Sequence, residues 1–240
     1  MIQQRAIMHW SGGKDSALAL YHSLRSGRWD VRALLTSTNE QHQRVSMHGV
    51  RTTLVQAQAE RLRLPLHWLS LPGDVSMEEY NAQMQAALKF YSGQGVTHSI
   101  FGDIFLEDLR QYREGQLNQA NLRGEFPLWQ RDSTELLHEF VDLGFRAVLV
   151  CVNEKHLGPE FLGRELNLEL LRDLPRSVDP CGENGEYHSF VYDGPIFSSP
   201  ISFTKGEIVR RTYSPSGRTD CHEDEQDSGW DTGFWYQDLL

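Results

Sequence analysis

The sequence predicts an α/β fold, in which helices cover both faces of a parallel sheet and a smaller α+β lobe follows. The first hundred residues alternate short apolar runs with amphipathic stretches at helical spacing. Two adjacent glycines, Gly12 and Gly13, separate the first apolar run from the first amphipathic stretch. Beyond residue 105 the regular alternation ends. Strands that alternate with helices imply right-handed crossovers and parallel pairing.

The first half of the chain supplies the parallel sheet and its helices. The run at 6–10 is short and apolar and ends at the glycines, as a buried parallel strand does. The helix after it carries Ala17, Leu20 and Leu24 at helical spacing, and Gly27 ends it. The polar segment 36–46 is expected to be a loop. The other expected strands are 31–35, 66–69 and 98–101, and the expected helices are 15–24, 50–62 and 77–91.

The second half mixes charged helical stretches with short apolar runs. We expect helices at 106–122, 133–143 and 162–174, strands at 125–129 and 146–152, a structured loop and hairpin at 182–197, and a strand pair at 201–213. Residues 214–229 are polar and acidic, so they are expected to be a mobile tail. The aromatic residues Trp230, Phe234, Trp235 and Tyr236 follow the tail and are expected to dock on this domain or on a second subunit, which leaves a homodimer open.

Composition excludes several classes of protein. The net charge of −10 disfavours sequence-independent binding to nucleic acid, because phosphate backbones would be repelled. The N-terminus lacks a signal pattern, and no apolar run approaches the ~20 residues that cross a bilayer. Cys151, Cys181 and Cys221 are far apart and form no Cys-x-x-Cys pair or disulfide framework. We therefore expect a cytoplasmic protein that contacts neither membrane nor nucleic acid.

The segment Ser11-Gly12-Gly13-Lys14-Asp15-Ser16 is the most distinctive feature of the chain. Its backbone N–H groups and the positive end of the following helix dipole would bind an anion such as phosphate. The spacing is not that of a Walker loop. Gly102 and Asp103 follow the expected strand at 98–101, so they are expected at the same edge of the sheet, where ligands bind in such folds.

This segment resembles the pyrophosphate-binding loop of the N-type ATP pyrophosphatases, which cleave ATP to AMP and pyrophosphate. The resemblance implies a Rossmann-like nucleotide domain of the adenine nucleotide α-hydrolase type at 1–104 and a substrate-binding lobe at 105–213. The acidic tail with its aromatic end then occupies 214–240. ATP is the implied cofactor, and Mg²⁺ is expected to bridge its phosphates, with Asp15 and Asp103 as ligands.

A second set of motifs narrows the resemblance. Gly102-Asp103-Ile104, Pro127-Leu128-Trp129 and Cys181-Gly182-Glu183-Asn184-Gly185-Glu186-Tyr187 follow the first loop in this order. The set resembles the diphthine–ammonia ligase family, which adenylates a carboxylate and lets ammonia displace AMP to form an amide. The best-known members act on a modified histidine of translation elongation factor 2. Differences at 47–50 and 107–110 indicate a related subfamily.

Each candidate residue has an expected role. Ser11, Gly12, Gly13, Lys14 and Ser16 would hold the departing pyrophosphate, while Thr36, at the end of the second strand, would lie near adenine. His48 would reach the phosphates or cap a helix. The resemblance places the substrate pocket at Glu183, Asn184, Gly185, Glu186 and Tyr187, where Glu183 and Glu186 would hold ammonium and take its proton. Tyr187 would face a cationic substrate group. Lys14 and Asp15 complete the expected catalytic set with the two glutamates.

Two other functions remain open on the sequence. A tRNA-modifying pyrophosphatase of the thiolating or lysine-attaching type would share the first loop, and Cys181 would then be a candidate nucleophile. A nucleotide-binding sensor without ligase activity would retain the loop alone. The leading prediction remains an ATP-dependent ligase that acts on a carboxylate of a small molecule or a protein side chain and on ammonia.

Overall fold

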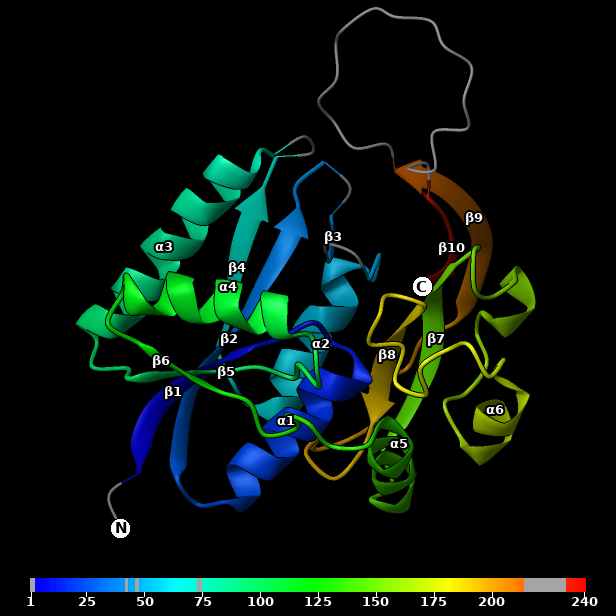
Figure 1. The fold of residues 1–240 in the computed structure, drawn as a ribbon, viewed down its shortest axis with the longest axis horizontal. Coiled ribbons are helices and arrows are strands. Elements are labelled where there is room, and N and C mark those ends of the chain that lie inside the picture. The colour runs from blue at the N-terminus through cyan, green and yellow to red at the C-terminus, as the bar shows by residue number, and fades with distance from the viewer. Residues whose placement is uncertain (1–2, 42, 46–47, 73–74, 214–231) are drawn as a thin grey trace, which may run out of the picture.

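Two sheets of different character organise the chain (Figure 1). The computed structural model describes residues 3–41, 43–45, 48–72, 75–213 and 232–240. The first sheet is parallel except for one short strand, and the second is antiparallel. This arrangement confirms the predicted fold class.

The first sheet is built around β1, which pairs in parallel with β2 on one side and β5 on the other. The strand order is β3-β2-β1-β5-β6, and β4 also pairs with β2. Among the described strands of this first sheet, only the two-residue β3 runs antiparallel to its neighbour. The strands are β1 (Gln4–His9), β2 (Trp29–Asn39), β3 (Arg44–Val45), β4 (Leu66–Leu71), β5 (His98–Ile100) and β6 (Arg123–Glu125).

Helices cover both faces of this sheet because successive side chains of β1 point to opposite faces. Ala6 and Met8 pack with α1 (Lys14–Arg25) and α2 (Thr52–Leu62). Ile7 packs on the other face with α3 (Met77–Gly93) and α4 (Glu107–Asn118). The core on the α1 and α2 face continues into the second sheet, so both sheets share one apolar interior.

The second sheet has the order β8-β7-β10-β9, and Figure 1 shows it beside the first. Its strands are β7 (Arg146–Asn153), β8 (Tyr187–Asp193), β9 (Lys205–Tyr213) and β10 (Thr232–Leu239). The helices of this half are α5 (Ser133–Asp142), the 3-10 turn η1 (Pro159–Phe161) and α6 (Leu168–Asp173). The C-terminal aromatics therefore dock on their own domain, because β10 carries Phe234, Trp235 and Tyr236 between β7 and β9.

Local capping explains where several helices begin. Ser76 and Glu79 form a reciprocal capping box at the start of α3. Asp132 accepts a hydrogen bond from the N–H of Glu135 at the start of α5, and Asn167 does the same for Leu170 in α6. By contrast, α1 begins at Gly13 without any side-chain cap. Apart from that of Lys14, which donates to Ser189, its first-turn N–H groups are therefore suited to receive an external anion.

Five local predictions are wrong. The hairpin expected within 182–197 is the single strand β8, which pairs with β7 instead. The segment 36–46 is not all loop, because β2 continues to Asn39 and pairs with β4. The strand expected at 125–129 is β6, which ends at Glu125. The helix expected at 162–174 is only α6, since residues 163–166 bond to the backbone of β7. The strand pair expected at 201–213 is the single strand β9, whose partner β10 lies far along the chain.

The sheets also cross the expected domain limits. β6 extends the first sheet beyond residue 104, and residues 232–239 form an inner strand of the second sheet rather than the end of a tail. The tail expected at 214–229, together with Trp230 and Cys221, lies outside the described residues. None of the described helices has the length and apolar character needed to span a bilayer.

Removal of residues 232–240 should destroy the second sheet. β10 pairs on both sides and buries Tyr236 and Leu239, and burial of each such side chain contributes about 1.5–3 kcal/mol. We expect the truncated chain to lose cooperative thermal unfolding, or to unfold about 10 °C or more below the full chain. Circular dichroism melting would measure this. Leu240→Ala, at an exposed position, is the control and should change little; an unchanged midpoint after truncation would contradict the role of β10.

Candidate functional site

The strand order brings two distant loops to one edge of the first sheet. The chain leaves β1 towards β2, whereas β5 lies on the other side of β1, so the order reverses between β1 and β5. Open parallel sheets bind ligands at such a switch point, beyond the carboxyl ends of the strands. The Ser11–Ser16 loop follows β1, and Gly102 and Asp103 follow β5. The predicted convergence of these loops is confirmed.

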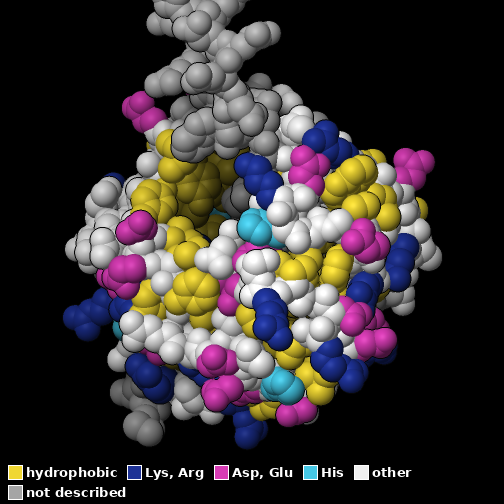
Figure 2. Space-filling model, turned by 45° about the vertical axis from the view of Figure 1, so that its right-hand side comes forward, with side chains coloured by type: hydrophobic (Ala, Val, Ile, Leu, Met, Phe, Trp, Pro, Cys, Tyr) yellow, Lys and Arg dark blue, Asp and Glu magenta, His cyan; other side chains and the backbone are white. Residues whose placement is uncertain are grey.

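A cavity of about 360 Å³ lies at this edge. Figure 2 shows one face of the molecule hollowed out, with hydrophobic side chains on its walls and a histidine and basic side chains near its edge. The cavity is lined by the loops after β1 and β5, the stretch from Gly182 into β8, helices α3 and α4, and residues of β2, β3 and the segment at His48. The lining residues used below are Ser11, Gly13, Lys14, Asp15, Ser16, Leu35, Ser37, Val45, His48, Asp103, Arg113, Glu183, Tyr187, His188 and Ser189.

The glycines of the phosphate loop are required by close packing. Gly12 has φ +80°, and a Cβ there would lie 2.8 Å from Oε1 of Gln58. A Cβ on Gly13 would lie 3.0 Å from the ring of His48. A Cβ on Gly102 would lie 2.7 Å from the backbone carbon of Asp15. The loop after β5 therefore packs directly on the phosphate loop, backbone against backbone.

Gln58 of α2 holds the phosphate loop from below, although sequence reasoning missed it. It is fully buried; its Oε1 accepts from the indole N–H of Trp10 at 2.9 Å, and its Nε2 donates to the carbonyl of Gly12 at 3.0 Å. The same nitrogen donates to the carbonyl of Val191 at 2.6 Å. A buried amide with this many partners fixes the backbone around it. The only sequence signal was a glutamine among the apolar positions of a predicted helix.

Strand β8 holds the loop from the other side. The N–H of Val191 donates to the carbonyl of Gly12 at 2.9 Å, and the N–H of Lys14 donates to Oγ of Ser189 at 3.2 Å. Within the loop, Oγ of Ser11 accepts from the N–H of Gly13, and Oγ of Ser16 donates to the carbonyl of Gly13. The two serine hydroxyls thus stiffen the loop from within. Because the N–H groups of Gly13 and Lys14 already donate to serine hydroxyls, those of Asp15 and Ser16 in the first turn of α1 are the natural contacts for an anion.

Lys14 joins the two halves of the cavity. It is 4 % exposed, and its ammonium group donates to Asp15 at 2.7 Å and to the carbonyl of Cys181. Burial opposes its charge, but the Asp15 carboxylate more than offsets burial, so the pKa of Lys14 lies above its ordinary value. The ammonium also lies 5.2 Å from the ring centre of Tyr187. The cation over this ring is therefore Lys14, where we had expected a substrate group.

Three carboxylates, those of Asp15, Asp103 and Glu183, line the cavity. Burial raises the pKa of Asp15, and Asp179 and Asp103 add to this effect. Burial and then repulsion from Asp15 raise the pKa of Glu183 to about 7. Oε1 of Glu183 accepts a hydrogen bond from the N–H of Ile104 at 2.7 Å, which ties the Cys181–Tyr187 loop to the loop after β5. Asp103 pairs with Arg113 at 2.7 Å.

Glu186 is turned away from the cavity. It is 1 % exposed, and its carboxylate accepts from the backbone N–H groups of Asp179 and Asn184 and from the side chain of Asn184. Gly185, with φ +84°, makes the turn between them. Glu186 and Asn184 therefore shape the loop, and of the two predicted glutamates only Glu183 reaches the cavity.

Other predicted residues have structural partners. Thr36 is buried, and its hydroxyl donates to the carbonyl of Trp10 at 2.8 Å; Ser37 lines the cavity in its place. His48 lines the cavity and stacks on His188 with ring centres 4.4 Å apart. Burial lowers the pKa of His48 to about 4 and that of His188 well below its ordinary value, so both rings are neutral near pH 7.

Cys181 does not have the surroundings of a nucleophile. Burial raises the pKa of its thiol, and Sγ donates to the carbonyl of Ser133 at 3.3 Å. A protonated, buried thiol is inert. Cys151 is also buried, and burial raises its pKa to about 12.

The carboxylates suit a cation that arrives with phosphates. The part of the chain that the structure describes contains no group of three or more His, Cys, Asp or Glu placed to hold a metal ion. Asp15 nonetheless leaves 30 % of its side chain exposed at the cavity. The charge of Asp103 raises the pKa of Asp15, and the charge of Asp15 raises the pKa of Glu183, so the three carboxylates lie near one another. Mg²⁺ commonly uses one or two carboxylates and completes its shell with phosphate oxygens and water, and this donor set fits that pattern.

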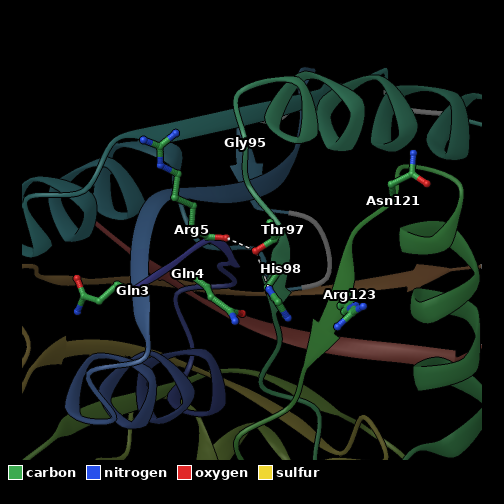
Figure 3. Close-up of a pocket in the computed structure, with 8 residues that line it drawn as sticks. All are labelled: Gln3, Gln4, Arg5, Gly95, Thr97, His98, Asn121 and Arg123. Carbon is green, nitrogen blue, oxygen red and sulfur yellow. Dashed lines mark hydrogen bonds between the residues drawn. The ribbon is translucent and has the colours of Figure 1, made fainter. Parts of the chain in front are cut away.

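A second cavity lies at the opposite edge of the sheet (Figure 3). Its lining comes from the amino ends of β1, β5 and β6 and from neighbouring turns, with Arg5, Thr97 and His98 among its residues. Arg5 donates to the carbonyl of Gln94, and Thr97 bonds to His98. Ligands of parallel sheets bind at the carboxyl ends, so this cavity is not the candidate site.

Comparison of the sequence with known proteins identifies relatives over most of the chain. A family model described as the diphthamide synthase N-terminal domain matches residues 4–119, and one described as the diphthamide synthase C-terminal domain matches 132–217. A diphthine–ammonia ligase of Danio rerio is 27 % identical over 220 residues, which cover 83 % of this chain and 86 % of the relative. That of Bos taurus is 27 % identical over 227 residues, covering 83 % and 82 %. That of Schizosaccharomyces pombe is 25 % identical over 221 residues, covering 84 % and 36 %.

Gly102→Ala should separate the two loops that form the site. The new Cβ meets backbone atoms of Asp15 and Ser16 at 2.7–2.9 Å, so the phosphate loop must move. We expect ATP affinity, measured by calorimetry, to fall by about tenfold or more, which corresponds to ~1.4 kcal/mol of strain. Gly115→Ala is the matched control, since a Cβ at that helical glycine meets nothing within 4 Å; equal ATP affinities in the two variants would contradict the close packing.

Ionisation of Glu183 should reduce stability as pH rises. Its pKa is near 4.5 when unperturbed and about 7 in the fold, so the folded chain binds the proton more tightly. The cost of ionising it in the fold is therefore absent below about pH 4.5, grows as pH rises, and is complete above about pH 7. In Glu183→Gln, Oε1 can still accept from Ile104. The free energy of unfolding of this variant, relative to that of the native chain, should therefore be higher at pH 8 than at pH 4. Denaturant melts at both pH values would measure this, with exposed Glu207→Gln as control; a gain independent of pH would contradict the assignment.

Proposed function

Because the chain belongs to the diphthamide synthase family, we propose that it is an ATP-dependent ligase that joins ammonia to the carboxylate of diphthine in an amide bond. The observation that best supports this proposal is that the phosphate loop and the Cys181–Tyr187 loop line one cavity and are joined by the hydrogen bond from Lys14 to the carbonyl of Cys181. A nucleotide and an acceptor held in the same cavity can react directly.

We propose that ATP lies with its terminal phosphates on Ser11–Ser16 and its adenosine towards the end of β2. The uncapped N-terminus of α1 and the ammonium group of Lys14 would neutralise the departing pyrophosphate. Leu35 and Ser37, rather than Thr36, are the residues of β2 that line the cavity, and they would lie near the adenosine. Asp15 would hold Mg²⁺ together with phosphate oxygens, and Asp103 would support it; the ion would supply charge neutralisation of the phosphates.

The first step would transfer adenylate to the acceptor. A carboxylate oxygen of diphthine forms a bond to the α-phosphorus of ATP, and the bond from that phosphorus to the oxygen bridging to the β-phosphorus breaks. Pyrophosphate leaves with the electron pair, and an acyl-adenylate remains. The chain contributes position and fixed charge to this step and no covalent bond of its own.

In the second step ammonia attacks the acyl carbon and AMP leaves. The attacking nitrogen must lose a proton, and Glu183 is the carboxylate of the Cys181–Tyr187 loop that lines the cavity. Its pKa of about 7 means that a large fraction is ionised near neutral pH and that the group can both accept and release a proton there. We therefore assign the proton acceptor to Glu183 and leave Glu186 as the residue that shapes its loop.

The buried, protonated thiols of Cys151 and Cys181 give no support to a thiolating enzyme.

We propose that the nucleotide unit extends through β6 and that the acceptor lobe starts at α5. We propose that the protein is cytoplasmic, because Cys151 and Cys181 are free thiols and reducing compartments keep thiols in this form. The strand β10 takes Phe234, Trp235 and Tyr236 into its own sheet, so these residues give no support to a homodimer.

The products should identify the reaction. Incubation with ATP, Mg²⁺, ammonium and a diphthine-bearing protein should yield AMP and pyrophosphate, separated by ion-exchange chromatography, together with the amide, detected by mass spectrometry. ADP as the nucleotide product would refute the proposal.

Asp15→Asn should reduce this turnover by about 100-fold or more, because it removes the carboxylate beside Lys14. Asp108→Asn is the matched control: it also replaces a carboxylate in the first turn of a helix, but at an exposed position outside the cavity lining. Native turnover in Asp15→Asn would remove the assignment.

A further inference from the structure

A carboxylate of strand β10 joins the second sheet to a segment of the first. Asp238 accepts two hydrogen bonds from the guanidinium group of Arg51, at 3.0 and 2.6 Å, and its Oδ1 lies 2.9 Å from Nη2 of Arg44. The Asp238 side chain is 17 % exposed. A bidentate pair between an arginine and a carboxylate fixes the geometry of both partners as well as their charges. Asp238 therefore has a defined hold on two arginines that lie far from it in the sequence.

The two arginines lie on opposite sides of one short segment, which we call the His48 segment (residues 43–45 and 48–52). Arg44 and Arg51 face each other as an antiparallel bridge between these sides. Arg44 also donates a hydrogen bond to the carbonyl of Gly49 at 2.7 Å. Because one carboxylate binds both arginines, it holds the two sides of the segment together.

A second residue of β10 packs on the same segment. Gly49 has φ +69°, and a Cβ there would lie 2.6 Å from the ring of Tyr236. Tyr236 is buried and lies two residues before Asp238, and side chains two apart on a strand share one face. β10 thus contacts the His48 segment at two places, once through a ring and once through an ion pair.

The segment in turn brings His48 onto the phosphate loop. Val45 and His48 both line the main cavity. Cε1 of His48 is 3.0 Å from the position that a Cβ on Gly13 would take, while β8 receives the ring through stacking on His188 and a bond to the backbone of Ser189. Nδ1 of His48 has no hydrogen-bond partner within the part of the chain that the structure describes, so the ring has a polar atom to offer a bound molecule.

We propose that Asp238 is a positioning residue for nucleotide binding, which holds the His48 segment through Arg44 and Arg51 and so keeps His48 against the phosphate loop. Asp238 itself lies outside the cavity lining, and 187 positions separate it from Arg51. This inference rests on the proposed binding of ATP and adds to it a distant residue on which the affinity for ATP depends.

Calorimetric titration of ATP tests this dependence by comparing Asp238→Asn with Glu154→Gln. Glu154 also accepts two hydrogen bonds from one arginine, but that arginine is Arg210 of β9, and neither residue lines the cavity. Below the thermal midpoint of each variant, Asp238→Asn should raise the Kd for ATP about fivefold or more, and Glu154→Gln should change it less than about twofold. Native ATP affinity in Asp238→Asn, or an equal loss in both variants, would overturn the inference.

A double-mutant cycle determines whether the effect passes through His48. His48→Ala already lacks the ring, so adding Asp238→Asn to it should change the Kd for ATP by less than about twofold. A purely structural role would instead lower the thermal midpoint by the same amount in both backgrounds and leave the two losses of ATP affinity additive. Additive losses would therefore rule out positioning through His48.

Amide hydrogen exchange without ATP separates failure of this inference from failure of the proposed reaction. The N–H groups of Val45 and Gly49 bond within the His48 segment, and that of Lys14 bonds to Ser189. In Asp238→Asn these three amides should exchange about tenfold faster or more than in Glu154→Gln. If they exchange alike in both variants, Asp238 does not hold the segment, whether or not the native chain amidates diphthine. If exchange rises as expected but the native chain does not bind ATP, the assigned nucleotide fails and the positioning of His48 stands.

Discussion

The structure depends on how the phosphate loop is held. The loop has two glycines and no side-chain cap on the helix that follows it, so its own residues do not determine one conformation. Gln58 bonds to the carbonyl of Gly12 from α2, Val191 bonds to the same carbonyl from β8, and Gly102 packs against the backbone of Asp15. A helix, a strand of the second sheet and the loop after β5 thus meet at the phosphate loop, whose residues line the cavity.

The second sheet is consequently part of the nucleotide site rather than an appended lobe. β8 reaches the loop through Ser189 and Val191, and the segment before β8 supplies Cys181, Glu183 and Tyr187. The shared apolar core prevents the two sheets from moving independently at low cost. This rigidity suits a reaction in which catalysis relies on placing an acceptor oxygen opposite a leaving group.

The charges of the cavity form a second constraint. Asp15, Asp103 and Glu183 lie near two cations, Lys14 and Arg113, and burial makes each uncompensated charge costly. The result is a set of shifted pKa values, with Glu183 titrating near neutrality. Such shifts concentrate where proton transfer and charged intermediates occur. Because carboxylates outnumber cations in the cavity, a divalent cation together with the guanidinium of Arg113 would neutralise their negative charge.

The sequence alone determined the elements whose signals are local. The apolar run into Gly12 and Gly13 predicted β1, the phosphate loop and α1, and the motifs from Gly102 to Tyr187 predicted the family. Tertiary structure decided what depends on partners distant in sequence. The polar stretch after Leu35 continues as strand because β4 pairs with it, and the aromatic C-terminus becomes an inner strand because β7 and β9 flank it. Gln58, Ser189 and Arg113 carry no motif; they matter because the fold places their hydrogen-bonding groups against a loop and a carboxylate that lie far from them in the chain. Which glutamate faces the cavity was likewise decided by the turn at Gly185, which directs Glu186 to backbone N–H groups and leaves Glu183 at the surface of the cavity.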